Sequence, residues 1–226
     1  MEMPGIFCYF ELQSALIMSN KIQDLEALQD IRKMMERSSR FISLSGWSGV
    51  AAGLAALVGA FFGKKEIDSY YAGYPNGENC PSCLKFNLMV IAGAVFIVAL
   101  LGAFFFTYAK ARKENIAVWG NASKRLLWNT LLPMGAGGLV IWRMMDLQQY
   151  ELVAPVSLIF YGLALINGSK YTLGEVKYLG YAIILTGIGG LWMIGSGLYI
   201  WAFGFGILHI IYGFTMWMKY DRRDNA

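Results

Sequence analysis

The feature that most constrains this chain is a run of 23 residues, 41–63, that contains no charged side chain. As an α-helix rising about 1.5 Å per residue it would span about 34 Å, enough to cross a hydrocarbon core of about 30 Å. Further apolar runs follow at residues 86–108, 126–145, 150–168, 176–194 and 198–218. Charged residues make up only 15% of the chain, too few for the surface of a soluble domain. We therefore predict an all-α polytopic membrane protein with about six transmembrane helices.

The positions of Lys and Arg predict its orientation, because basic flanks are retained in the cytoplasm. Fifteen of the 19 basic residues flank one side of the spans, including the segments before residue 41 and after residue 218. The other side holds Lys64, Lys65, Lys85 and Arg143. Both termini are therefore expected in the cytoplasm. No basic patch with interleaved aromatic residues suggests nucleic-acid binding, so the expected partner of the positive charge is the lipid bilayer.

The sequence predicts short segments on either side of the membrane domain. We divide the chain into an upstream extension or disordered segment at 1–19, a cytoplasmic amphipathic helix at 20–40, the membrane domain at 41–218 and a cytoplasmic tail at 219–226. The helix is predicted from an apolar stripe of Leu25, Leu28, Ile31 and Met35 with charged residues opposite. It could lie against the membrane, against its own chain or against a partner protein.

Small residues recur at steps of three and four along the first span. They are Gly46, Gly49, Gly53, Ala56, Ala60 and Gly63. Close backbone approach is how membrane helices associate, so this stripe predicts tight packing on another span or on a second copy in a homo-oligomer.

Cys80-Pro81-Ser82-Cys83 is the first candidate site, in the loop after the first span on the non-cytoplasmic side. Thiols there are usually oxidised, which favours a local disulfide. A redox-active pair, a metal site and free thiols remain alternatives. Thioredoxin-like proteins place a CxxC centre at the start of a helix in a βαβ unit, and that context is not predicted here. Zinc usually takes four ligands, and this loop offers two thiolates and no histidine.

His209 is the second candidate, because it is the only histidine and lies about 15 Å into the last span. An ionisable group at that depth either lines a cavity or proton path, or is a neutral imidazole bonded to a Ser, Tyr or backbone carbonyl. One histidine cannot supply paired haem ligands, and we expect no metal or cofactor.

Helix irregularities favour the cavity. The third span carries Pro133, Gly135, Gly137 and Gly138, which predict a kink, and the last span carries Gly204 and Gly206 near His209. Asn129 and Asn167 are further polar groups in or near the spans. If the protein consists of two halves of three spans, the irregularities occupy corresponding positions, as at transporter binding sites.

Residues 31–46, IRKMMERSSRFISLSG, resemble the opening of a family of small, uncharacterised multi-pass membrane proteins of bacteria. The resemblance is best over residues 24–65. It implies a bacterial inner membrane and no particular activity.

Three functions are consistent with these patterns. The first is a small transporter, channel or membrane-partner module with a polar path between the third and sixth spans, in which Pro133, Gly137, Gly206 and His209 share a cavity. The second is a thiol–disulfide redox protein using Cys80 and Cys83. The third is a structural or regulatory subunit that contacts its partner through residues 20–40. No catalytic motif other than the cysteine pair is found, so an enzyme is not the expected class.

Overall fold

The computed structural model describes residues 45–73, 80–113 and 119–221, and every regular element in these ranges is a helix. The predictions for residues 1–19 and 20–40 lie outside the described residues. The main helices are α2 (Gly46–Gly73), α3 (Pro81–Lys113), α4 (Asn121–Asp146), α5 (Val153–Gly168) and α6 (Val176–Gly190). The 3₁₀ turns η2 (Tyr150–Leu152) and η3 (Ser169–Tyr171) flank α5. The last span is built from α7 (Gly197–Trp201), η4 (Ala202–Ile207), α8 (Leu208–Met216) and η5 (Trp217–Asp221), of which η4 and η5 are π-helical.

Each of the six apolar runs contains a helix in its described part, and four of the described helices are long and apolar enough to cross a membrane. They are Gly46–Gly73, Pro81–Lys113, Tyr150–Tyr171 and Gly197–Tyr220. Helix α6 is apolar but has 15 residues, so it rises about 22 Å, short of a hydrocarbon core of about 30 Å. The structure thus shows an all-helical protein with four candidate membrane spans.

Several helix boundaries differ from the predicted runs, among them the start of α3 at Pro81 and the start of α4 at Asn121. Helix α2 continues ten residues past Gly63 to Gly73, and Lys64 and Asp68 form an ion pair one turn apart on this extension. Helix α6 ends at Gly190 instead of residue 194, because a turn follows in which Gly195 has a φ of 84°, a conformation that favours glycine.

Of the two spans predicted to be irregular, the last contains irregular helix, and the kink predicted at Pro133 stays a prediction. Helix α4 runs without a break through Pro133, whereas the irregular backbone lies in the last span, where η4 includes Gly204 and Gly206. A π-helical turn is wider than an α-helical turn and is frequent at functional sites. The last span is therefore the better place to look for a site.

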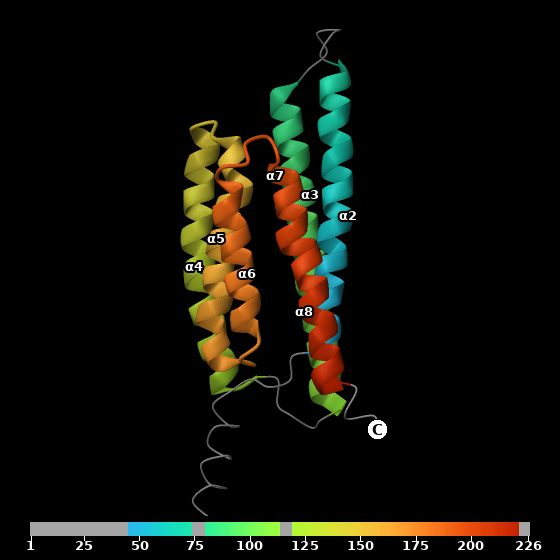
Figure 1. Cartoon of the computed structure of the whole chain (residues 1–226), viewed down its shortest axis with the longest axis vertical. Coiled ribbons are helices and arrows are strands. Elements are labelled where there is room, and N and C mark those ends of the chain that lie inside the picture. Colours follow the sequence, from blue (N-terminus) through green and yellow to red (C-terminus); the bar gives the residue numbers. More distant parts are fainter. Residues whose placement is uncertain (1–44, 74–79, 114–118, 222–226) are drawn as a thin grey trace, which may run out of the picture. The chain divides into compact units, whose positions relative to one another are not determined.

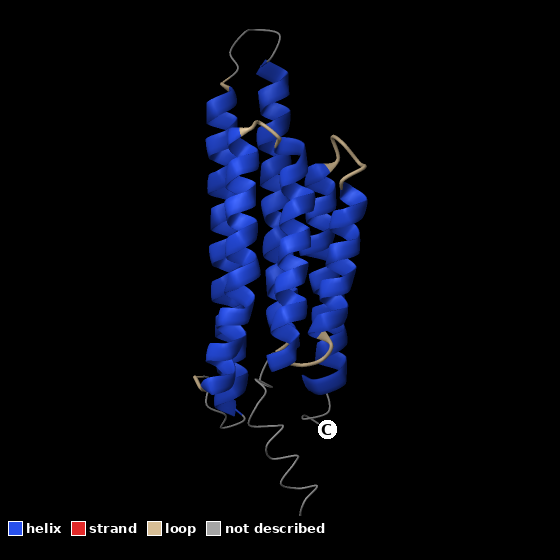
Figure 2. Ribbon diagram, turned by 90° about the vertical axis from the view of Figure 1, so that its left-hand side faces the viewer, coloured by secondary structure: helices blue, strands red, loops and turns tan. Residues whose placement is uncertain are grey.

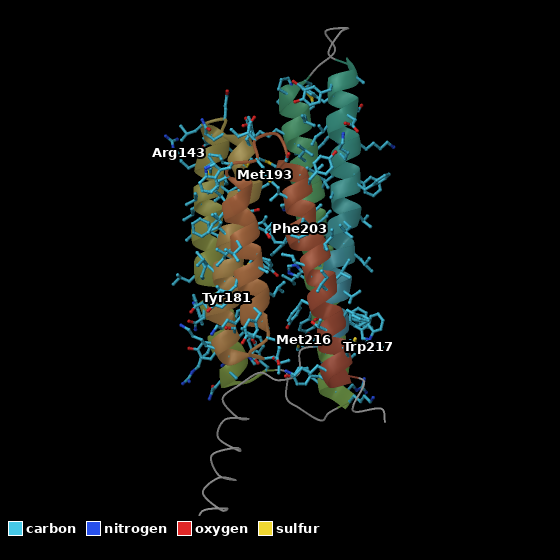
Figure 3. The ribbon with its side chains drawn as sticks, viewed as in Figure 1. Arg143, Tyr181, Met193, Phe203, Met216 and Trp217 are labelled. Atoms are coloured by element: carbon cyan, nitrogen blue, oxygen red, sulfur yellow. A yellow bond between two sulfur atoms is a disulfide. The ribbon has the colours of Figure 1, made fainter. Side chains whose placement is uncertain are left out.

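The membrane domain is held together by antiparallel helix pairs (Figures 1 and 2). Helix α2 packs on α3 and on the last span, and α5 packs on α4 and α6. A buried cluster of Leu158, Leu179, Ile183 and Ile200 joins α5, α6 and the last span. Arg143 and Met193 lie toward one end of the helices, and Met216 and Trp217 toward the other (Figure 3).

The small-residue stripe of α2 faces the last span. A Cβ atom added to Gly53 would lie 2.7 Å from the Gly206 carbonyl oxygen, and one added to Gly49 would lie 3.1 Å from the Gly213 Cα. Ala56 and Ala60 are also buried, with 3% and 8% of their surface exposed. The partner of the stripe is thus another span of the same chain, and the backbones touch.

Helices α5 and α6 make the same kind of contact, which we did not predict from the sequence. A Cβ atom on Gly162 would lie 2.8 Å from the Gly180 carbonyl oxygen, and one on Gly187 would lie 2.8 Å from the Pro155 carbonyl oxygen. Backbone approach at this distance strengthens dispersion contacts between helices that have no hydrophobic driving force in lipid.

Candidate functional site

His209 lies at the middle of the last span and is bonded at both ring nitrogens. Its side chain is 5% exposed. The Tyr161 hydroxyl of α5 lies 2.9 Å from Nε2, and the Gly204 carbonyl oxygen lies 3.1 Å from Nδ1. These are the contacts of the second interpretation above, an imidazole bonded to a tyrosine and to a backbone carbonyl.

The two partners determine which tautomer of His209 fits. A carbonyl oxygen can only accept, so Nδ1 must carry the proton and donate it to Gly204. Nε2 of the neutral ring is then an acceptor, and the Tyr161 hydroxyl donates to it. The pair can also take up a proton without losing either contact, because Nε2–H of an imidazolium could donate back to the phenol oxygen.

Aromatic rings surround the pair. The ring centroid of Tyr161 lies 4.9 Å from that of Phe205 and 5.5 Å from that of His209, and Trp201 lies 5.2 Å from Phe205. Phe205 belongs to the π-helical segment η4, so the wide turn carries both the ring that packs on Tyr161 and the Gly204 carbonyl that receives the imidazole proton.

The residues predicted to share a cavity with His209 do not come together. Leu57 of α2 faces Gly206, and its Cδ2 would lie 2.5 Å from an added Cβ atom. Phe160 of α5 faces Gly137, and its Cβ atom would lie 2.5 Å from a Cβ atom added to Gly137. The glycines therefore admit large neighbouring side chains, and α4 contacts α5 at Phe160, whereas Tyr161 of α5 bonds His209 of the last span.

The remaining glycines of the α4 segment are open. Gly135 and Gly138 are exposed, with no atom within 4 Å of an added Cβ atom, and Pro133 is half-buried within the continuous helix. Neither glycine contacts another described helix at its Cβ position.

Asn129 and Asn167 form a separate polar contact between α4 and α5. Asn167 Nδ2 donates to the Asn129 carbonyl oxygen at 2.8 Å, and Asn129 Nδ2 donates to the Arg125 carbonyl oxygen at 2.7 Å. Lys170 donates to Asn167 Oδ1 at 3.2 Å. This cluster lies near the end of both helices and fastens them together.

A third polar cluster joins the start of α6 to the end of the last span. Glu175 accepts hydrogen bonds from Lys219, with which it forms an ion pair, and from the Tyr220 hydroxyl at 2.7 Å. Burial by itself would raise the pKa of the Glu175 carboxyl. The hydrogen bonds and the positive charge of Lys219 together lower the pKa by more, so it lies below its ordinary value of 4.5. The carboxylate is therefore the form that holds the two segments together.

Acid should weaken this contact. A carboxyl whose pKa is lowered on folding stabilises the folded state above the unfolded-state pKa, and that stability is lost as the pH falls through the folded-state pKa. We expect the free energy of unfolding to fall as the pH drops below the ordinary carboxyl pKa of 4.5, and Glu175→Gln to remove this part of the pH dependence. Denaturation in detergent at a series of pH values measures it. Glu151→Gln, at an exposed position in η2, is the matched control and should leave the slope unchanged.

Cys80 and Cys83 form a disulfide at the start of α3. Pro81 is the first residue of the helix, and the Leu84 amide donates to the Cys80 carbonyl oxygen at 3.1 Å. The Cys83 amide lies 3.2 Å from Cys80 Sγ and the Ser82 hydroxyl 3.3 Å from it. Cys83 is exposed and Cys80 is half-buried. The expected loop is therefore corrected: the pair occupies a helix N-terminus.

Sequence reasoning missed Tyr161, Glu175 and the contact from Tyr220. Tyr161 carries no local signal, because it is one of several tyrosines in apolar runs and bonds a residue 48 positions away. The helix start at Cys80 could have been found, since proline is favoured at the first position of a helix. Among the described residues, no group of three or more His, Cys, Asp and Glu side chains could hold a metal ion.

The chain was compared with protein families, curated proteins and solved structures. No family model, curated protein or solved structure matches it. The resemblance of residues 24–65 to a bacterial membrane family therefore stays a prediction, and function has to be inferred from the described geometry.

Proposed function

We propose that this chain is a multi-pass membrane protein that exchanges disulfides with protein thiols through Cys80 and Cys83. The observation that carries the proposal is the exposed disulfide at the first turn of α3, with an amide and a hydroxyl directed at one of its sulfur atoms. Cysteines at helix N-termini form thiolates more readily, because the helix dipole and the free amides favour negative charge there.

The two sulfur atoms would have different roles. A thiolate of the partner attacks the exposed Cys83 Sγ, the Cys80–Cys83 bond breaks, and Cys80 leaves as a thiolate stabilised by the Cys83 amide and Ser82. A second partner thiolate then attacks the mixed disulfide, a partner disulfide forms, and Cys83 leaves as a thiolate. Two electrons pass from the partner to the pair, and the reverse sequence reduces a partner disulfide.

The membrane placement belongs to the same proposal. We infer that all six helices lie in the bilayer of a bacterial inner membrane, with both termini in the cytoplasm and the cysteine pair on the opposite side. Exposed apolar side chains on α4 support its contact with lipid, because Leu132 and Leu139 are 73% and 75% exposed. The bias of Lys and Arg supports the orientation.

Trapping a mixed disulfide tests the assignment of roles. In the reduced protein we expect the exposed Cys83 to attack, because the half-buried Cys80 is less accessible to a partner, and Cys80 to resolve. Cys80→Ser should therefore accumulate a mixed disulfide with oxidised glutathione, whereas Cys83→Ser should form little. Both variants are made with Cys8→Ala, so that the third cysteine does not react. The adduct is measured by mass spectrometry of the full-length protein in detergent.

Ser82→Ala is the matched variant, because it removes one donor to Cys80 Sγ and leaves both cysteines in place. It should slow reduction of the disulfide by glutathione several-fold, by about the contribution of one hydrogen bond. A pair that stays oxidised in excess glutathione and forms no adduct in either single-cysteine variant would exclude a redox function.

Transport is the second candidate, favoured by the buried Tyr161–His209 pair in the middle of a candidate span. A polar path for it would run along the last span and α5, instead of between α4 and the last span. A role as a regulatory subunit, contacting a partner through residues 20–40, is a further proposal, which co-purification with and without that segment would test.

A further inference from the structure

Tyr161 and His209 are not isolated from the other polar groups of the domain. Tyr161 and Tyr212 both pack against the buried cluster formed by Leu158, Leu179, Ile183 and Ile200. Tyr212 follows His209 by three residues, so it lies on the same side of the helix, one turn nearer to Lys219. The three polar side chains thus follow one another along the contact between α5 and the last span.

Tyr212 also connects this pair with the Glu175 cluster. It precedes Lys219 and Tyr220 by seven and eight residues, about two helical turns, so it lies between His209 and the two residues that bind Glu175. Glu175 is hydrogen-bonded to Tyr220 and Lys219 where the start of α6 meets the end of the last span. Among the described residues, the half-buried Tyr212 hydroxyl has no hydrogen-bond partner, which is a costly arrangement unless water reaches it.

Apart from Tyr161 and Tyr212, no titratable side chain of the neighbouring described helices faces His209. The part of α2 that packs on the last span, residues 46–57, contains no titratable side chain. On α6, the titratable residues Lys177, Tyr178 and Tyr181 are all exposed on the outer face. The polar groups near His209 are therefore Tyr161 and Tyr212, and Glu175 is the acid at the outer end of the series.

We propose that Glu175, Tyr212 and Tyr161 form a proton path that connects His209 with the water at the end of the last span. A proton taken up by the Glu175 carboxylate moves to the Tyr212 oxygen while the Tyr212 proton moves to the Tyr161 oxygen and the Tyr161 proton moves to Nε2 of His209. Bridging water closes any gap longer than a hydrogen bond. The net result is one proton on the imidazole, and the Nδ1 contact with Gly204 is kept.

This inference does not depend on the thiol chemistry of the cysteine pair. It would give the second candidate function its transported ion, and it can be tested without a transport assay. Because His209 is the only histidine, the ring nitrogens of ¹⁵N-histidine-labelled protein in lipid nanodiscs give signals from one site. The ¹⁵N chemical shift of Nε2 changes when this nitrogen is protonated, so proton exchange between Nε2 and water is followed by NMR as the pH is lowered.

The wild-type imidazole should exchange faster than the backbone amides around it, and Tyr212→Phe and Glu175→Gln should each slow exchange roughly tenfold, about the factor that one hydrogen bond contributes. Tyr178→Phe, at a residue 70% exposed on α6, is the control and should exchange like wild type. Retention of the Nδ1–H tautomer shows that each variant keeps the site folded. A wild-type Nε2 that exchanges protons no faster than the backbone amides, or an unchanged rate in both Tyr212→Phe and Glu175→Gln, would overturn the proposal.

Discussion

Gly213→Ala is expected to lower the free energy of unfolding by about 3 kcal/mol, the upper part of the usual range for overpacking a close contact. A Cβ atom at this position would lie 2.6 Å from both the Gly46 carbonyl oxygen and the Val50 amide nitrogen. Both are backbone atoms, so they cannot move aside as a flexible side chain would. Helix α2 and the last span would have to separate, and the dispersion contacts along the whole pair would weaken.

Gly138→Ala is the matched control for this prediction. Gly138 lies within α4 and has no atom within 4 Å of an added Cβ atom, so the substitution meets no neighbour. Alanine is favoured over glycine in a helix by about 1 kcal/mol, and this variant should be as stable as wild type or more stable. Denaturation in detergent, followed by circular dichroism, compares the two. Equal stability of the variants would mean that α2 and the last span do not touch as described.

Tyr161→Phe should cost about 1–3 kcal/mol of unfolding free energy, since it leaves the buried Nε2 of His209 without its donor. Water cannot easily replace the hydroxyl, because the imidazole is 5% exposed and lies among Tyr161, Phe205 and apolar side chains. The same denaturation experiment measures the loss. Tyr178→Phe removes a hydroxyl from an exposed ring and should change stability little.

A double-mutant cycle separates the hydrogen bond from general disruption of the core. In the Tyr161→Phe background, His209→Phe removes the unsatisfied acceptor, so the double variant should lose less stability than the two single variants together. Strict additivity of the two losses would contradict a direct bond between these side chains.

Much of the architecture was predictable because it depends on local properties of the sequence. The length of an apolar run and its lack of charge require a helix wherever the backbone has no water to bond, so the six helical runs were found without knowledge of their neighbours. The small residues of α2 predicted a close contact for the same local reason. The helix boundaries were less predictable, because Lys64 and Asp68 can extend α2 by pairing with each other.

In the candidate sites, the residue types were predictable from the sequence but their partners were not. The cysteine pair and the single histidine are visible in the sequence as residue types, and the start of α3 at Pro81 follows from local helix preferences. The partner of each depends on how the helices pack. Tyr161 bonds His209 from 48 residues away, and Leu57 fills the space beside Gly206. Glu175, just before α6, forms an ion pair with Lys219 at the end of the last span.

The sequence by itself determined that this chain forms apolar helices and that Cys80 and Cys83 are close enough to bond, and it predicts that the basic residues collect on one side of the helices. Only the tertiary structure decided that α4 continues through Pro133, that the last span contains a π-helical turn, and that His209 is bonded to Tyr161 and Gly204. The physical reason is that hydrophobicity and helix formation are properties of neighbouring residues, whereas a buried polar contact exists only where packing brings a donor from one helix to an acceptor on another.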